Sequence, residues 1–143
     1  MALTRLLTSR TIGLQAAALP IQRTPAGRLM VGLVTSRGSG RWVLPKGWCS
    51  PGRSPFETAA MEAREEAGLI GEIGDTPIGR YRYRKGLHTL ASMMCEVHVF
   101  RLEVTEQLAK WPEMKQRRAA FCEPIAAARM VDEEELAALL RSL

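Results

Sequence analysis

Residues 44–69, LPKGWCSPGRSPFETAAMEAREEAGL, limit what this chain can fold into more than any other segment. They predict the end of a strand, a Gly/Pro loop and then a helix. Ser54 is a suitable N-cap, Pro55 takes the first helical position, where a missing N–H costs little, and Glu57 stands three residues after the cap. Gly68 is a suitable stop because glycine readily adopts the left-handed conformation that ends many helices. The segment therefore predicts a helix with well-defined ends.

Glu62, Glu65 and Glu66 lie near the end of this helix at positions i, i+3 and i+4, which places them on one helical face. Like charges at such positions destabilise a helix by roughly 0.2–0.5 kcal/mol per pair. A divalent cation would remove this repulsion, and carboxylate oxygens suit Mg²⁺ or Mn²⁺ better than Zn²⁺. An amphipathic helix with a solvated acidic face is the alternative. It explains the charges but not the Pro-Lys-Gly sequence before the loop.

The segment resembles the signature of the Nudix hydrolases, in which a glycine, a glutamate, an Arg-Glu pair, a Glu-Glu pair and a closing Gly-aliphatic pair recur at fixed spacing. Here the signature runs from Gly47 to Leu69, and the three glutamates that bind metal in the family are kept. Two positions depart, because Arg53 replaces the first glutamate and Met61 replaces the arginine. In the family, these two residues help to orient the metal-binding glutamates. One hypothesis is that Arg53 supplies the missing positive charge to the glutamates, and the alternative is that it points to solvent.

The resemblance implies an α/β fold, a Nudix-type α/β/α sandwich with a mixed sheet in a single domain. It also implies a metal-dependent pyrophosphohydrolase with Mg²⁺ or Mn²⁺ as cofactor. The expected metal ligands are Glu62, Glu65, Glu66 and the backbone carbonyl of Gly47, and Glu65 and Glu66 are the expected catalytic residues. Family members often add one acidic ligand from outside the signature. Glu96, in a long predicted strand, is our candidate, and a solvent-facing strand residue is the alternative.

Outside the signature, residues 14–140 are similar to the diphosphoinositol polyphosphate and diadenosine polyphosphate phosphohydrolases. The similarity lies in the sequences TSR at 35–37 and RWVLP at 41–45 and in the later Trp111 and Phe121. It implies that Arg37, Arg41 and Lys46 contact phosphate, whereas a basic surface loop is the alternative. The implied substrate is a (di)nucleoside polyphosphate, an inositol pyrophosphate or a related nucleoside-diphosphate-linked compound, with oxidised nucleotides as the second choice. A catalytically impaired Nudix-fold ligand-binding module is the alternative function.

Charge is distributed unevenly along the 143 residues, whose formal net charge is +5. No Asp or Glu precedes Glu57, whereas that segment contains many arginines and the remainder is net acidic. A basic front half beside an acidic helix suits a phosphorylated small-molecule substrate, because arginines hold phosphates while glutamates hold metal. Nucleic acid is the weaker alternative as a partner.

Composition limits the remaining classes. The apolar and charged fractions of 46% and 24% are ordinary for a globular protein, and no apolar run approaches the ~20 residues that span a membrane. Three widely spaced cysteines predict neither a disulfide framework nor a zinc site and fit a reducing cytoplasm. Residues 1–13 are expected to form a flexible N-terminus, although the first eleven faintly resemble an organelle transit peptide. Residues 14–143 are expected to form the domain, as a monomer or homodimer.

Apolar runs, alternation and turn residues indicate the other elements. The alternation is strict over residues 78–85, where three arginines share one face and Tyr81 and Tyr83 share the other. The predicted helices are 124–130 and 132–140, and the predicted strands are 14–22, 28–35, 42–44, 78–85, 91–104 and 118–122.

Overall fold

The computed structural model describes residues 12–143, apart from the side chain of His88. Residues 1–11, which make up most of the predicted flexible N-terminus, lie outside the described residues, whereas Ile12 and Gly13 belong to the first strand. None of the helices in the described part of the chain is both long enough and apolar enough to cross a membrane. The elements in chain order are β1 (Ile12–Arg23), β2 (Leu29–Thr35), β3 (Trp42–Val43), β4 (Lys46–Trp48), α2 (Pro55–Ala67), β5 (Leu69–Ile73), β6 (Gly79–His88), β7 (Ala91–Gln107), β8 (Ala119–Cys122), α3 (Pro124–Met130) and α4 (Glu134–Arg141).

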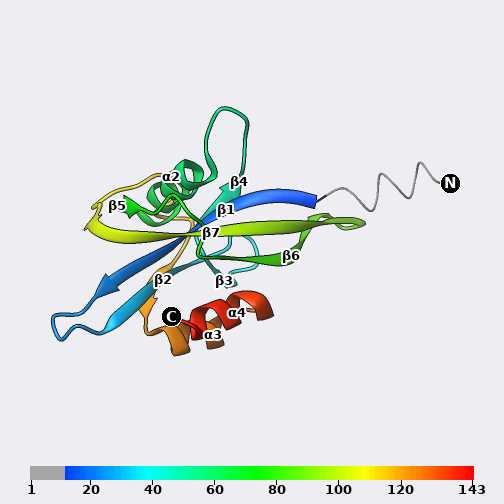
Figure 1. Cartoon of the computed structure of the whole chain (residues 1–143). Helices are drawn as coiled ribbons and strands as arrows, with labels where there is room; N and C mark the ends of the chain where they lie inside the picture. The colour runs from blue at the N-terminus through cyan, green and yellow to red at the C-terminus, as the bar shows by residue number, and fades with distance from the viewer. Residues whose placement is uncertain (1–11) are drawn as a thin grey trace.

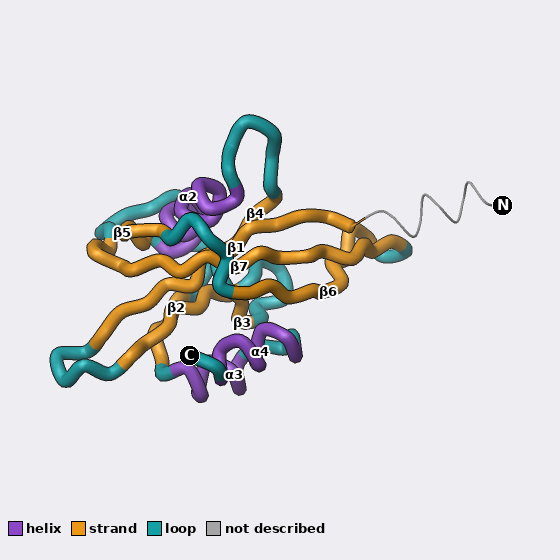
Figure 2. Tube along the Cα trace, viewed as in Figure 1, coloured by secondary structure: helices purple, strands orange, loops and turns teal. Residues whose placement is uncertain are grey.

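The strands form one mixed sheet of eight strands. Strand β1 runs parallel to β7 and antiparallel to β2 and β4. Strands β5 and β6 pair antiparallel with different parts of β7, and β3 and β8 pair antiparallel with β2. Helix α2 covers one face of the sheet, and helices α3 and α4 cover the other (Figures 1 and 2). This arrangement confirms the predicted α/β sandwich with a mixed sheet.

Alternation along β1 explains the two layers of the core, because successive side chains of a strand point to opposite faces. Ala16 and Ala18 pack with the alanines of α2, whereas Leu19 and Ile21 pack with the buried residues of α3 and α4. Small side chains on both β1 and α2 allow the helix to lie close to the sheet. Strand β4, which is one of the strands paired with β1, is thereby held beside the acidic end of α2.

The ends of α2 agree with the local signals. The Ser54 N–H donates to Glu57 Oε1 at 3.0 Å, Pro55 begins the helix, and Gly68 ends it with φ of 67°. Strands β4 and β5 were not predicted, since each is short and pairs through its backbone with a strand distant in sequence. Helix α4 begins two residues later than predicted, and β1 begins two residues earlier.

Candidate active site

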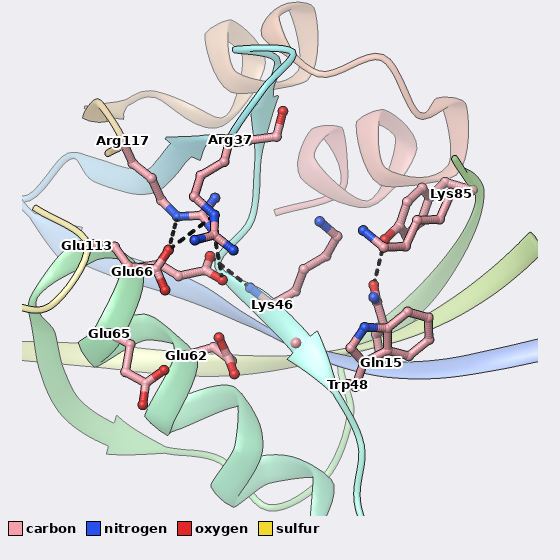
Figure 3. A pocket seen from close by; sticks show the side chains of 13 residues that line it. Gln15, Arg37, Lys46, Trp48, Glu62, Glu65, Glu66, Lys85, Glu113 and Arg117 are labelled. Carbon is pink, nitrogen blue, oxygen red and sulfur yellow. Dashed lines mark hydrogen bonds and ion pairs between the residues drawn. The ribbon is translucent and has the colours of Figure 1, made fainter. Parts of the chain in front are cut away.

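A cleft of about 470 Å³ opens beside strand β4. Side chains from α2, from β4, from the loop after β2 and from the loop between β7 and β8 line it. Figure 3 shows Glu66 beside the cationic side chains, with Glu62 and Glu65 on the same helix nearby. The charged residues of the lining are Glu62, Glu65, Glu66 and Glu113 and, of opposite sign, Arg37, Lys46, Lys85 and Arg117. The cleft therefore combines the acidic face of the helix with four cations.

Strand β4 touches two of these glutamates through its backbone. The Lys46 N–H donates to Glu66 Oε1 at 3.3 Å. A Cβ atom built on Gly47 would lie 2.5 Å from the carboxyl carbon of Glu62, which is closer than van der Waals contact permits. The glycine therefore lets the Glu62 carboxylate lie directly against the strand, and this explains its place in the sequence better than a turn would, since its φ is not positive.

The two inner carboxyl groups resist ionisation. Burial raises the pKa of Glu66 to about 8, although the nearby Arg117 acts in the opposite direction, and only 5% of Glu66 is exposed. Burial also raises the pKa of Glu62, which shares a hydrogen bond with Glu66. Burial lowers the pKa of the Lys46 ammonium in the same cleft, against the attraction of Glu66. Glu62 and Glu66 are thus a close carboxyl pair in which burial disfavours the charged forms.

Among residues 12–143, no three acidic, histidine or cysteine side chains are arranged closely enough to hold a metal ion as they stand. The donor set nevertheless fits a hard divalent cation, because carboxylate oxygens are the ligands that Mg²⁺ and Mn²⁺ prefer. A bound cation would also favour the ionised forms of Glu62 and Glu66, whose pKa values burial raises. Glu65, one turn along the same helix face, lines the cleft beside them.

Arg117, in the loop between β7 and β8, was not predicted from the sequence. Its guanidinium donates from Nε to Glu113 Oε1 at 2.8 Å and from one terminal nitrogen to the Thr35 carbonyl at 3.0 Å. The other terminal nitrogen lies 3.4 Å from Glu66 Oε2. Arg37 also approaches the Glu113 carboxylate, with its Nε 3.8 Å from Glu113 Oε1 (Figure 3). No local pattern marks Arg117 as a site residue, since Thr35 and Glu66 lie far away in the sequence and only Glu113 is near.

The loop that carries Arg117 also holds the C-terminal turn of α2. Backbone carbonyls at a helix end have no partner within the helix and need donors from elsewhere. Here the Glu113 N–H donates to the Glu65 carbonyl at 3.0 Å, and the Trp111 indole donates to the Glu66 carbonyl at 3.2 Å. The Gln107 amide donates to the Ala67 carbonyl at 3.0 Å. The turn that bears Glu65 and Glu66 is therefore attached at successive residues to this loop and to Gln107 at the end of β7.

Not every predicted site residue lies in the cleft. Arg37, Lys46 and Gly47 line it with the three glutamates. Arg41 instead approaches Glu133 at 3.2 Å beside helix α4, outside the lining of the cleft. Glu96 also lies outside it, and its carboxylate pairs with Arg82 at 3.1 Å and with His98 at 3.0 Å. The structure therefore does not bring Glu96 to the other glutamates, because β7 places it on the part of the sheet next to β6.

The hypothesis that Arg53 serves the glutamate cluster is wrong for this structure. One terminal nitrogen of Arg53 lies 2.9 Å from the Met61 sulfur, and Arg53 does not line the cleft. The two positions that depart from the Nudix signature thus contact each other. Met61 therefore gives the glutamates no charged partner, and Arg117 is the arginine that approaches Glu66.

Sequence comparison agrees with the geometry. The NUDIX domain profile matches residues 14–142, and the chain therefore belongs to the Nudix family. Nudix hydrolase 12, mitochondrial, of Arabidopsis thaliana is 36% identical over 93 residues, which are 63% of this chain and 46% of that protein. Nudix hydrolase 16, mitochondrial, of the same plant is 34% identical over 96 residues, 64% of this chain and 53% of that protein. The chain thus spans about half the length of the curated relatives it matches.

Solved structures share the fold over nearly the whole chain. A C. elegans Ap4A hydrolase binary complex superposes with a TM-score of 0.67 and 20% identity, covering 91% of this chain and 93% of that one. A NUDIX hydrolase from Nitrosomonas europaea gives a TM-score of 0.68 and 17% identity, covering 92% and 87%. At these identities the likeness shows the fold alone. The predicted family and the predicted fold are both confirmed.

Proposed function

We propose that this chain is a metal-dependent pyrophosphohydrolase that cleaves a phosphoanhydride bond. The observation that supports the proposal most directly is one cleft in which Glu62, Glu65 and Glu66 stand with four cations. The carboxylates suit a bound metal ion and the cations suit a bound polyphosphate, so one cleft meets both requirements of the reaction. Belonging to the Nudix family supports the same reaction class.

The proposed metal ion is Mg²⁺ or Mn²⁺, held by Glu62, Glu65 and Glu66 near Gly47. Bound there, it would neutralise phosphate charge and lower the pKa of a bound water. The side chains of Arg37 and Lys46 would bind phosphate oxygens, and their charge would stabilise the leaving phosphate. The attacking water must lose a proton, and Glu65 and Glu66 are the proposed acceptors, because they belong to the cleft and are carboxylates when ionised.

For the substrate we propose a (di)nucleoside polyphosphate, an inositol pyrophosphate or a related nucleoside-diphosphate-linked compound. Similarity of fold to an Ap4A hydrolase and the mixture of cations in the cleft support this choice. A panel of these compounds, assayed with Mg²⁺ and with Mn²⁺, tests the proposal. We expect product from at least one compound, loss of turnover with EDTA and recovery when the metal is restored. Turnover that EDTA leaves intact would contradict the metal-dependent mechanism.

A pair of variants tests the role of the cleft cations. Arg37 lines the cleft, whereas Arg41 comes from the same loop and turns to Asp132 and Glu133. Arg37→Gln should raise KM for the best polyphosphate roughly tenfold, in line with the loss of one charge-assisted hydrogen bond of about 1.5 kcal/mol. Arg41→Gln is the matched control and should change KM less than twofold.

The second candidate function is a Nudix-fold ligand-binding module without catalysis. The observation that favours it is the loss of both orienting residues of the signature, since Arg53 and Met61 contact each other and neither lines the cleft. Calorimetry on the same panel separates the two functions. Tight binding of one compound with no turnover in either metal would support the binding module and refute the hydrolase.

A further inference from the structure

The Nudix signature places an arginine on the metal helix, and this chain has Met61 there. Methionine cannot donate hydrogen bonds to a carboxylate, so position 61 offers the glutamates no donor. Arg53, the other departure, contacts the Met61 sulfur and lies outside the cleft. Some other group must therefore hold the carboxylates if they are to bind an ion with defined geometry.

Arg117 has the position that this task requires. Its side chain is 10% exposed and lies beside a Glu66 side chain that is 6% exposed, and their closest nitrogen and oxygen are 3.4 Å apart. The same guanidinium donates to Glu113 at 2.8 Å and to the Thr35 carbonyl at 3.0 Å. Its nitrogens thus have two hydrogen-bond acceptors and one ion-pair partner, on three segments of the chain, which are the end of β2, the loop and the end of α2.

We propose that Arg117 is the positioning residue for the Glu66 carboxylate, in place of the arginine that Met61 replaces. This inference rests on the proposed metal-dependent function. A guanidinium is planar and rigid, so two strong hydrogen bonds fix the direction of its remaining N–H groups. The bonds to Glu113 and Thr35 therefore orient Arg117 toward Glu66. Its loop also supplies the donors for the carbonyls of Glu65 and Glu66, so the side chains and the backbone of that turn are held from one place.

Arg117→Lys separates an electrostatic role from a positioning role. A cation beside Glu66 favours the ionised carboxylate that a metal ion needs, so loss of the charge alone would also weaken metal binding, whereas lysine keeps the charge and loses only the fixed orientation. Loss of orientation should weaken metal binding, because partners that hold metal ligands typically contribute 10- to 100-fold in affinity. A purely structural role would lower the melting temperature and leave the affinity of the folded protein unchanged.

The experiment measures Mn²⁺ binding by electron paramagnetic resonance of free Mn²⁺, without substrate, on Arg117→Met. We expect the Kd for Mn²⁺ to rise roughly 10- to 100-fold. Arg118→Met is the matched control, because Arg118 is the next residue, is exposed and has its guanidinium carbon 5.4 Å from the Trp42 ring centre. The control should keep its Kd within twofold. A Kd for Arg117→Met that is unchanged or lower would overturn the proposal.

Arg117→Lys keeps the inference testable if Arg117→Met does not fold. Lysine retains the charge but cannot hold two acceptors and the Glu66 carboxylate from one rigid plane. We expect its Kd to rise at least threefold at a normal melting temperature, and a Kd equal to that of the unchanged protein would refute the positioning role. The Kd for Mn²⁺ is measured without turnover. If no substrate is hydrolysed, the Kd values of the variants therefore still support or refute the positioning role of Arg117.

Discussion

Replacing Gly47 with alanine tests the close approach of strand β4 to the acidic face of helix α2. The backbone of Gly47 does not require glycine, since its φ is not positive, and therefore alanine introduces no backbone strain. The added methyl carbon would lie 2.5 Å from the carboxyl carbon of Glu62. Ordinary contact between such atoms begins at roughly 3.5 Å, so the carboxylate must move by about 1 Å.

The structure predicts a large effect on function and a small one on stability. Glu62 is half-buried and ends in a flexible side chain, so it can rotate away from the methyl group at a cost of about 1 kcal/mol or less. A displacement of about 1 Å in a group that positions reactants can lower the rate on the order of 100-fold. Gly47→Ala should therefore lose about two orders of magnitude in kcat/KM and bind Mn²⁺ more weakly.

The assay compares kcat/KM on the best substrate, the Kd for Mn²⁺ and the urea midpoint of unfolding. Gly86→Ala is the matched control, because a Cβ atom at Gly86 would meet nothing within 4 Å and its φ is not positive. The control should match the unchanged protein in all three measurements. Activity of Gly47→Ala within threefold of the unchanged protein would show that the reaction does not depend on the position of the Glu62 carboxylate against β4.

Three further predictions concern the same helix. Glu65→Gln and Glu66→Gln should each remove most activity and weaken Mn²⁺ binding while the circular dichroism spectrum stays native; near-normal values in both would contradict the metal helix. In EDTA, the free energy of unfolding should fall as the pH rises from about 4.5 to about 8, because Glu66 keeps its proton longer in the folded than in the unfolded chain. Glu66→Gln should flatten that slope in pH-dependent urea titrations. Arg53→Ala should keep the Mg²⁺ dependence of activity, since Arg53 contacts Met61 rather than the glutamates; a marked loss at low Mg²⁺ would restore the discarded hypothesis.

Local signals predicted helix α2 well because its determinants lie next to one another. The Ser54 cap, the Pro55 start and the Gly68 stop act through contacts within a few residues, and the structure has all three. The spacing of Glu62, Glu65 and Glu66 likewise follows from helix geometry alone. Short strands such as β4 escaped prediction, because three residues carry no readable alternation and their backbone partners come from β1.

The sequence could not decide which basic residues of the loop after β2 line the cleft. Arg37 and Arg41 stand four positions apart in one loop and had equal claims to a phosphate, yet one lines the cleft and the other pairs with Glu133 beside α4. Arg side chains are long and flexible, so the partner that tertiary packing brings near decides where each one points. Glu96 is a similar case, because its strand carries it to Arg82 and His98 and away from the cleft.

The amino-acid sequence by itself determined the family, helix α2 and the acidic face that the spacing of its glutamates creates, because these depend on neighbours along the chain. Only the tertiary structure decided what holds that face in place. Arg117 follows Glu66 by about fifty residues and reaches it because the loop between β7 and β8 folds back over the end of α2. Contacts of this kind depend on how the strands pair and how the loop returns, and no periodicity or local motif in the sequence records them.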